Sequence, residues 1–134
     1  MRISLVLLAL ALAACGSDPD GFDDSQVPGH LRQPILEAIA TVNADTGSRF
    51  RLEPGGDSSI VFEAMTDACG RGGRERIMRR LRVIFHTDYL IEPRASDSRC
   101  QLFPPAARHE FGHAAGLGHV CDNTSYMHSP DACR

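Results

Sequence analysis

The sequence predicts a small, single-domain α+β protein, and three observations support this fold class. The length of 134 residues allows one domain. The composition, 43% hydrophobic and 23% charged, is typical of a chain that folds around a core. The expected elements are a helix, two strands, a short helix, a strand and a final helix, an order that indicates a mixed sheet-and-helix domain.

The first helix is predicted over residues 31–45, because apolar residues recur there at helical spacing. The apolar face consists of Leu31, Ile35, Ile39 and Val42. Pro34 suits the first turn of this helix, and Gly47 is expected to end it. Strands are predicted over residues 49–53 and 59–65, separated by a Pro-Gly-Gly turn.

The next part of the chain has a more ambiguous pattern. Glycines at positions 70, 72 and 73 predict a loop. Residues 74–81 are assigned to a short helix, although their spacing also suits a strand, and a strand is expected from there to Ile91. The last helix is predicted to open at Pro104 and to run to about Ala115.

The N-terminus is expected to be a targeting segment rather than part of the fold. Residues 3–14 are almost wholly apolar and too short to span a bilayer as a permanent helix of about 20 residues. This pattern is typical of a secretory signal peptide. It ends in Leu12-Ala13-Ala14-Cys15, which resembles a bacterial lipobox and implies lipidation of Cys15. Ordinary signal cleavage, with Cys15 incidental, is the alternative.

These observations divide the chain into three parts. Residues 1–14 are the signal peptide, residues 15–29 are the lipidated cysteine and a flexible tether, and residues 30–134 are the folded domain. The tether is polar, acidic and rich in Gly and Pro. Acyl chains on Cys15 would hold the domain on a membrane of the cell envelope, outside the cytoplasm. Gly16 points, by analogy with Gram-negative sorting, to the outer membrane.

Export also favours disulfide formation. Cys69, Cys100, Cys121 and Cys133 remain after Cys15, and four cysteines allow three connectivities. The sequence does not choose among them. We prefer Cys69–Cys100 and Cys121–Cys133, because both pairs close moderate loops.

One segment near the C-terminus, HEFGHAAGLGH, carries the strongest functional signal. On a helix, His109 and His113 lie one turn apart on the same face, so both imidazoles can reach one metal ion. Gly116 can take a positive φ, end the helix and let His119 return as a third ligand. Three neutral nitrogens leave one tetrahedral position of zinc open to water, as in catalytic sites. Glu110 is expected beside that water as the general base.

This segment resembles the metzincin metallopeptidases, whose pattern HExxHxxGxxH precedes a methionine-containing turn. Met127, eight residues after His119, matches that turn at a spacing similar to the matrixin branch. The resemblance implies a metzincin-like zincin with one catalytic Zn²⁺, a short β-sheet, an upstream helix and an active-site helix. It also implies that Met127 forms an apolar floor beneath the histidines and that Glu110 delivers the proton to the leaving amine.

The chain departs from the matrixin pattern in several places. Val120 and Cys121 follow the third histidine, where matrixins usually have Ser directly after it. No tyrosine stands two places after Met127, so an astacin-like fifth ligand is not expected. The chain stops seven residues after Met127, without the family's C-terminal helix. Cys121 is a possible zinc ligand itself, but a disulfide is favoured because three histidines suffice.

The sequence therefore predicts a zinc-dependent endopeptidase that acts on protein or peptide substrates. The alternative is a non-catalytic, zinc-binding surface lipoprotein. Glu110 argues against the alternative, since a protein that only binds zinc does not need a glutamate beside the first ligand. Nucleic acid is not expected as a partner, because the net charge of −3 gives no basic excess. We expect a monomer.

Overall fold

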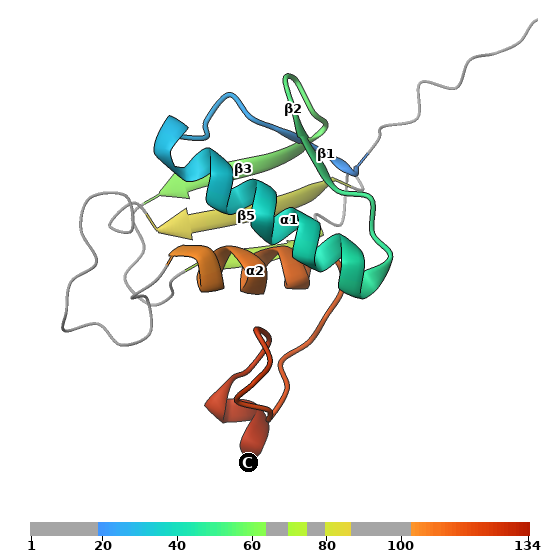
Figure 1. The fold of residues 1–134 in the computed structure, drawn as a ribbon, viewed down its shortest axis with the longest axis vertical. Helices are drawn as coiled ribbons and strands as arrows, with labels where there is room; N and C mark the ends of the chain where they lie inside the picture. The colour runs from blue at the N-terminus through green and yellow to red at the C-terminus, as the bar shows by residue number, and fades with distance from the viewer. Residues whose placement is uncertain (1–18, 64–69, 75–79, 87–102) are drawn as a thin grey trace, which may run out of the picture.

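The computed structural model describes residues 19–63, 70–74, 80–86 and 103–134, and these form a small α+β domain (Figure 1). Five strands make one sheet in the order β2-β1-β3-β5-β4. The strands are β1 (Gly21–Asp23), β2 (Arg51–Glu53), β3 (Ser58–Glu63), β4 (Gly70–Arg74) and β5 (Leu81–His86). The first four of that order run parallel to one another, and β4 runs antiparallel to β5 at one edge.

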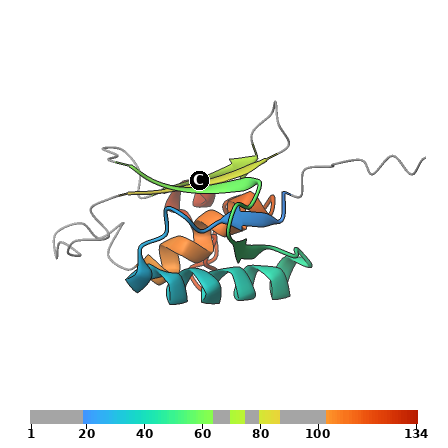
Figure 2. The ribbon, with the colours of Figure 1, turned by 90° about the horizontal axis from the view of Figure 1, so that it is seen from above.

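Two α-helices cover one face of the sheet (Figure 2). They are α1 (Arg32–Thr46), which follows the 3-10 turn η1 (Gly29–Leu31), and α2 (Phe103–Ala114). Helix α2 packs against α1, β4 and β5. The chain after α2 lies beside this helix and ends in the 3-10 turn η3 (Pro130–Cys133) (Figure 1). Within the described residues, no helix has the length and apolar character needed to cross a membrane.

Helix α1 confirms the first prediction from the sequence. Its buried face consists of Ile35, Ala38, Ile39 and Val42, whereas Leu36 on the outer side is 37% exposed. Gly47 ends the helix with φ of 72°, and its N–H donates to the carbonyl of Asn43. The Asn43 side chain then bonds both the N–H and the carbonyl of Phe50, which fixes the entry into β2.

Aromatic side chains fill the core between the sheet and the helices. The ring of Phe22 in β1 packs edge-on against Phe50 and Phe111, at centroid distances of 5.4 and 5.1 Å. Phe85 in β5 contacts Phe103 and Phe111 from the other side. Phe111 of α2 therefore bridges β1 and β5, and it holds α2 against the sheet through interactions worth about 1 kcal/mol each beyond simple burial.

The structure corrects the prediction of a flexible tether that extends to residue 29. Residues 21–23 form β1, an inner strand between β2 and β3. The polar composition hid this strand, because Phe22 is the only large apolar residue in it and is completely buried. Gly56, after β2, lies so close to β1 that a Cβ would stand 2.6 Å from the carbonyl oxygen of Gly21. The signal peptide and Cys15 lie outside the described residues.

The structure also corrects the glycine-rich region. Gly70–Arg74, predicted as a loop, forms β4 and pairs along its length with β5. The predicted helix over residues 74–81 is wrong at both ends, because Arg74 ends β4 and Leu81 begins β5. Pairing with a neighbouring strand decides this structure, and glycines carry no side-chain pattern that would signal it. Residues 75–79 and 87–91 lie outside the described residues.

The remaining predicted elements are confirmed with small shifts. The strands predicted over residues 49–53 and 59–65 correspond to β2 and β3, and residues 64–65 lie outside the described residues. The final helix, α2, begins at Phe103 and ends at Ala114. Each end of α2 lies one residue from the predicted position, because the terminal turns of a helix fray.

The assignment of Phe22 to the core makes a prediction about stability. Replacing Phe22 with Ala should lower the free energy of unfolding by about 3–5 kcal/mol, because a buried aromatic side chain leaves a cavity. Leu36→Ala, at an exposed position, is the matched control and should change it by less than about 1 kcal/mol. Urea denaturation measures both. A near-zero effect of Phe22→Ala would mean that residues 21–23 are a tether after all.

Candidate metal centre

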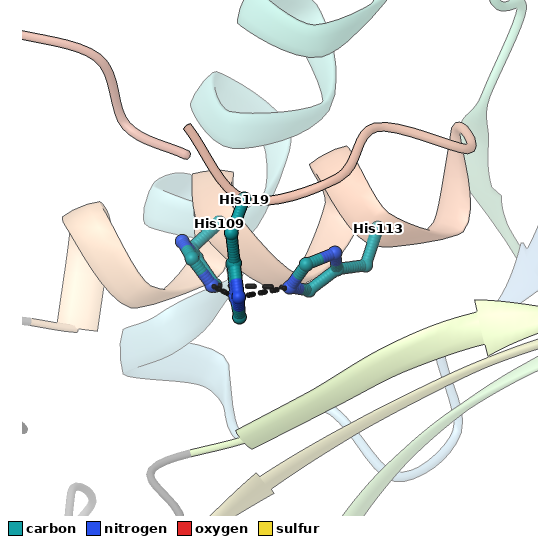
Figure 3. Close-up of side chains that lie close together, drawn as sticks. All are labelled: His109, His113 and His119. Atoms are coloured by element: carbon teal, nitrogen blue, oxygen red, sulfur yellow. Dashed lines mark hydrogen bonds between the residues drawn. The ribbon is translucent and has the colours of Figure 1, made fainter. Parts of the chain in front are cut away.

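Three histidines converge beside α2, as Figure 3 shows. His109 and His113 come from α2, and His119 comes from the segment that follows it. Their three Nε2 atoms lie 3.1–3.2 Å from one another. The predicted ligand trio is thus brought together with one nitrogen of each ring facing a common point.

Second contacts of two of these rings define which nitrogen carries the proton. Nδ1 of His109 lies 2.7 Å from the Tyr126 carbonyl, and Nδ1 of His113 lies 2.9 Å from the Leu117 carbonyl. A carbonyl only accepts hydrogen bonds, so both Nδ1 atoms donate, and in a neutral imidazole Nε2 is then a bare lone pair. Burial lowers the pKa of His109, which favours this neutral form.

Two facing lone pairs at 3.1 Å repel each other, and a hydrogen bond between them is ruled out in the neutral tautomers. A cation at the common point removes this repulsion. The carbonyls that orient the rings are the kind of outer partner that metal-binding histidines use. The donor set therefore fits a metal ion, and His109, His113 and His119 are the residues that would hold it.

A tight helix ending brings His119 to this point. Gly116 has φ of +93°, a conformation that favours glycine. The N–H of Gly116 donates to the His113 carbonyl, and the N–H of Leu117 donates to the Gly112 carbonyl. This is the Schellman arrangement, and it confirms the predicted turn. The same turn places the Leu117 carbonyl against the His113 ring, so the helix ending orients two of the three ligands.

Core packing determines which side of α2 carries the ligands. Six residues of α2 are buried: Phe103, Ala107, Glu110, Phe111, Gly112 and Ala114. Because Phe111 is fixed between Phe22 and Phe85, the face that carries His109 and His113 must lie on the other side of the helix. The orientation of two ligands is thus a consequence of core packing.

Met127, in the segment that follows α2, packs against α2 beside the histidines. It is 3% exposed, and its Sδ atom lies 2.3 Å from the position that a Cβ on Gly112 would occupy. The adjacent Tyr126 ring lies 3.1 Å from the same position. Met127 therefore packs directly on the helix next to His113, at a point where only glycine leaves room.

Tyr126 ties this segment to the rest of the domain. Its carbonyl orients His109, and its ring packs against the core. Burial raises the pKa of its hydroxyl, and the nearby carboxylate of Asp45, near the end of α1, raises it further. Tyr126 thus contacts α1, α2 and a metal-site ligand at once.

Glu110 is a buried carboxyl group beside the first ligand. It is 5% exposed, and burial raises its pKa to about 7. Its Oε2 atom has no hydrogen-bond partner among the residues that the structure describes. A buried polar atom without a partner costs about 1–3 kcal/mol, which is typical of a group kept for chemistry rather than stability.

The cysteine predictions have different outcomes. Cys121 and Cys133 form a disulfide, as predicted, so Cys121 is not a metal ligand in this structure. Cys69 and Cys100 lie outside the described residues.

The chain has no match among protein-family models or among curated proteins. The assignment of the candidate metal centre therefore rests on the sequence pattern and the geometry of this chain.

Three residues that shape the site were not predicted from the sequence. Gly112 had a signal, because glycine inside a helix costs about 1 kcal/mol relative to alanine and so often marks a close contact. Phe111 also had one, since it falls on the apolar stripe of α2. Tyr126 had none, because its role depends on a backbone carbonyl.

Gly112 makes a prediction about metal affinity. Gly112→Ala should weaken zinc binding about 10–100-fold, because the new methyl group displaces Met127 and disturbs the ring orientations. Gly118→Ala is the matched control, since a Cβ at Gly118 meets nothing within 4 Å. Competition against a chromophoric chelator measures both affinities. Equal affinity in the two variants would show that the Met127 contact does not support the site.

The buried Glu110 makes a prediction about pH in the metal-free protein. Its pKa is raised to about 7 from 4.5, so the folded state retains a proton that the unfolded state has lost. Stability from this group is therefore highest at acidic pH and falls as the pH rises towards 7. Compared with Glu110→Gln, the wild-type chain should lose roughly 2–3 kcal/mol between pH 5 and pH 8. Urea denaturation in chelator tests this, and parallel pH curves would contradict it.

Proposed function

We propose that the protein is a zinc-dependent endopeptidase of the metzincin type. The observation that carries this proposal is the convergence of three Nε2 atoms. The residue after the first ligand, Glu110, adds a buried carboxyl group whose Oε2 atom has no partner among the described residues. The spacing HExxHxxGxxH and the position of Met127 add support. The matrixin branch is the subgroup that the Met127 spacing favours.

Zinc is the metal that suits this donor set best. A tetrahedral zinc ion with Zn–N bonds of about 2.0–2.1 Å requires nitrogens roughly 3.3 Å apart. The separations of 3.1–3.2 Å are close to this value. Among the described residues, no fourth His, Cys, Asp or Glu joins the cluster. His119 is exposed, so the site is open to solvent and substrate, as catalytic rather than structural zinc sites are.

Glu110 is the proposed general base. When bound, zinc supplies Lewis acidity and makes water a nucleophile near neutral pH. Glu110 accepts the proton of the attacking water and then passes it to the leaving amine. The buried carboxyl group, with an Oε2 atom that has no partner among the described residues, is available for both roles.

The orienting residues hold the ligands in one arrangement before substrate arrives. The Tyr126 and Leu117 carbonyls fix the tautomers of His109 and His113, and Met127 packs under the ligand-bearing turn of α2. A site held in this way loses little free energy to reorganisation during the reaction.

We further propose that the domain works in the cell envelope, anchored through Cys15. The apolar leader and the lipobox-like sequence before Cys15 support this. The substrates would then be proteins or peptides outside the cytoplasm, and we expect the protein to act as a monomer.

The test of the general base is Glu110→Gln. This variant should keep one zinc ion per chain and lose at least about 10²-fold in the rate of peptide cleavage, because the amide cannot accept the proton. Glu37→Gln, on the exposed side of α1, is the matched control and should retain full activity. Elemental analysis gives the zinc content, and a peptide library with and without chelator gives the activity.

Two results would contradict the proposal. Unchanged cleavage by Glu110→Gln would exclude Glu110 as the base. Stoichiometric zinc without chelator-sensitive cleavage in the wild-type chain would favour the non-catalytic, zinc-binding lipoprotein.

A further inference from the structure

The three ligands differ in how firmly the fold holds them. His109 and His113 project from a helix whose other face is packed into the aromatic core. His119 begins a segment with almost no core of its own, since residues 118–124 and 130–134 are all exposed. Met127 is the one fully buried side chain in this segment. The third ligand therefore depends on local restraints.

Those restraints form a closed loop directly after His119. The N–H of Val120 donates to the Met127 carbonyl, and the N–H of Ser129 donates to the Val120 carbonyl. This short bridge fixes Val120, the residue bonded to His119, against the turn that carries Met127. Val120 is 41% exposed, so water competes for its hydrogen bonds, and each contributes only about 1 kcal/mol.

The disulfide between Cys121 and Cys133 closes the same loop covalently. It spans 12 residues, and the ring that it forms contains Tyr126, which orients His109, and Met127, which packs on Gly112. Cys121 lies two residues after His119. One covalent bond therefore restrains the third ligand, the Tyr126 carbonyl that orients His109 and the Met127 side chain that packs beside His113.

We propose that the Cys121–Cys133 disulfide controls metal retention, so that the oxidised chain holds the ion and the reduced chain releases it. This inference rests on the proposed function, because it takes the three histidines as the metal ligands. It adds a redox regulation of that same site.

The chemistry is thiol–disulfide exchange with a dithiol reductant. One thiolate of the dithiol attacks a protein sulfur, breaks the S–S bond and forms a mixed disulfide. The second thiol then displaces the protein and closes a cyclic disulfide in the reductant. The dithiol loses two electrons and two protons, and Cys121 and Cys133 gain them as two thiols. Both cysteines are exposed, so a reductant can reach them.

The experiment compares Co²⁺ binding by variants of the full chain. Co²⁺ is the probe because its visible absorption reports the coordination geometry. The variant with both Cys121→Ser and Cys133→Ser should bind Co²⁺ at least about 10-fold more weakly than the oxidised wild type. Its far-UV circular dichroism should stay unchanged, because α1, α2 and the five strands of the described sheet all lie outside residues 121–133. The matched control carries Cys69→Ser and Cys100→Ser and should bind within about 3-fold of wild type.

A second measurement uses the wild-type chain itself. Reduction with a dithiol, which is then removed under argon, should produce the same loss of affinity, and reoxidation should restore it.

Unchanged Co²⁺ affinity in the Cys121/Cys133 variant would overturn the inference. A sulfur-to-cobalt absorption band at full affinity in the reduced chain would also overturn it, because Cys121 would then hold the metal. Collapse of the dichroism signal would make the disulfide a requirement of the whole fold and would likewise contradict the proposal.

Failure of the proposed function looks different in the same experiment. If the oxidised wild-type chain takes up no Co²⁺, the metal centre itself is refuted, and the redox control with it. If the wild type binds and the variant binds equally, the metal centre stands and the redox control alone fails.

Discussion

The site depends on one electrostatic constraint, the mutual repulsion of unprotonated imidazole nitrogens held about 3.1 Å apart. The Tyr126 and Leu117 carbonyls keep the protons on the far side of His109 and His113, so these rings cannot relieve the repulsion by hydrogen bonding to each other. A cation at the common point of the three Nε2 atoms would remove this repulsion. The packing around the three rings therefore has to keep their Nε2 atoms this close together.

The fold holds it through two kinds of packing. Phe111 locks α2 into the core, which turns His109 and His113 outward, and Gly116 reverses the chain so that His119 returns. Met127 then fits against Gly112, where any side chain would block it. The helix ligands depend on long-range burial, whereas the third ligand depends on a turn and a closed loop. The Cys121–Cys133 disulfide closes the loop on which the third ligand depends.

Local sequence patterns predicted the parts of the structure that local physics determines. The apolar face of α1, the stop at Gly47, helix α2 and the turn at Gly116 all follow from helical spacing and from the backbone freedom of glycine. The same holds for the convergence of the three histidines. The tether prediction was wrong at residues 21–23, because a single buried Phe22 gives no periodicity and β1 exists only through its neighbours β2 and β3. The loop prediction for residues 70–74 was wrong for the same reason, since pairing with β5 creates β4.

The most direct test of the central claim is X-ray absorption spectroscopy on the zinc-loaded, oxidised chain. The account predicts one zinc ion with three imidazole nitrogens and one oxygen, at about 2.0–2.1 Å. A sulfur neighbour at about 2.3 Å, or a chain that retains no zinc, would contradict it.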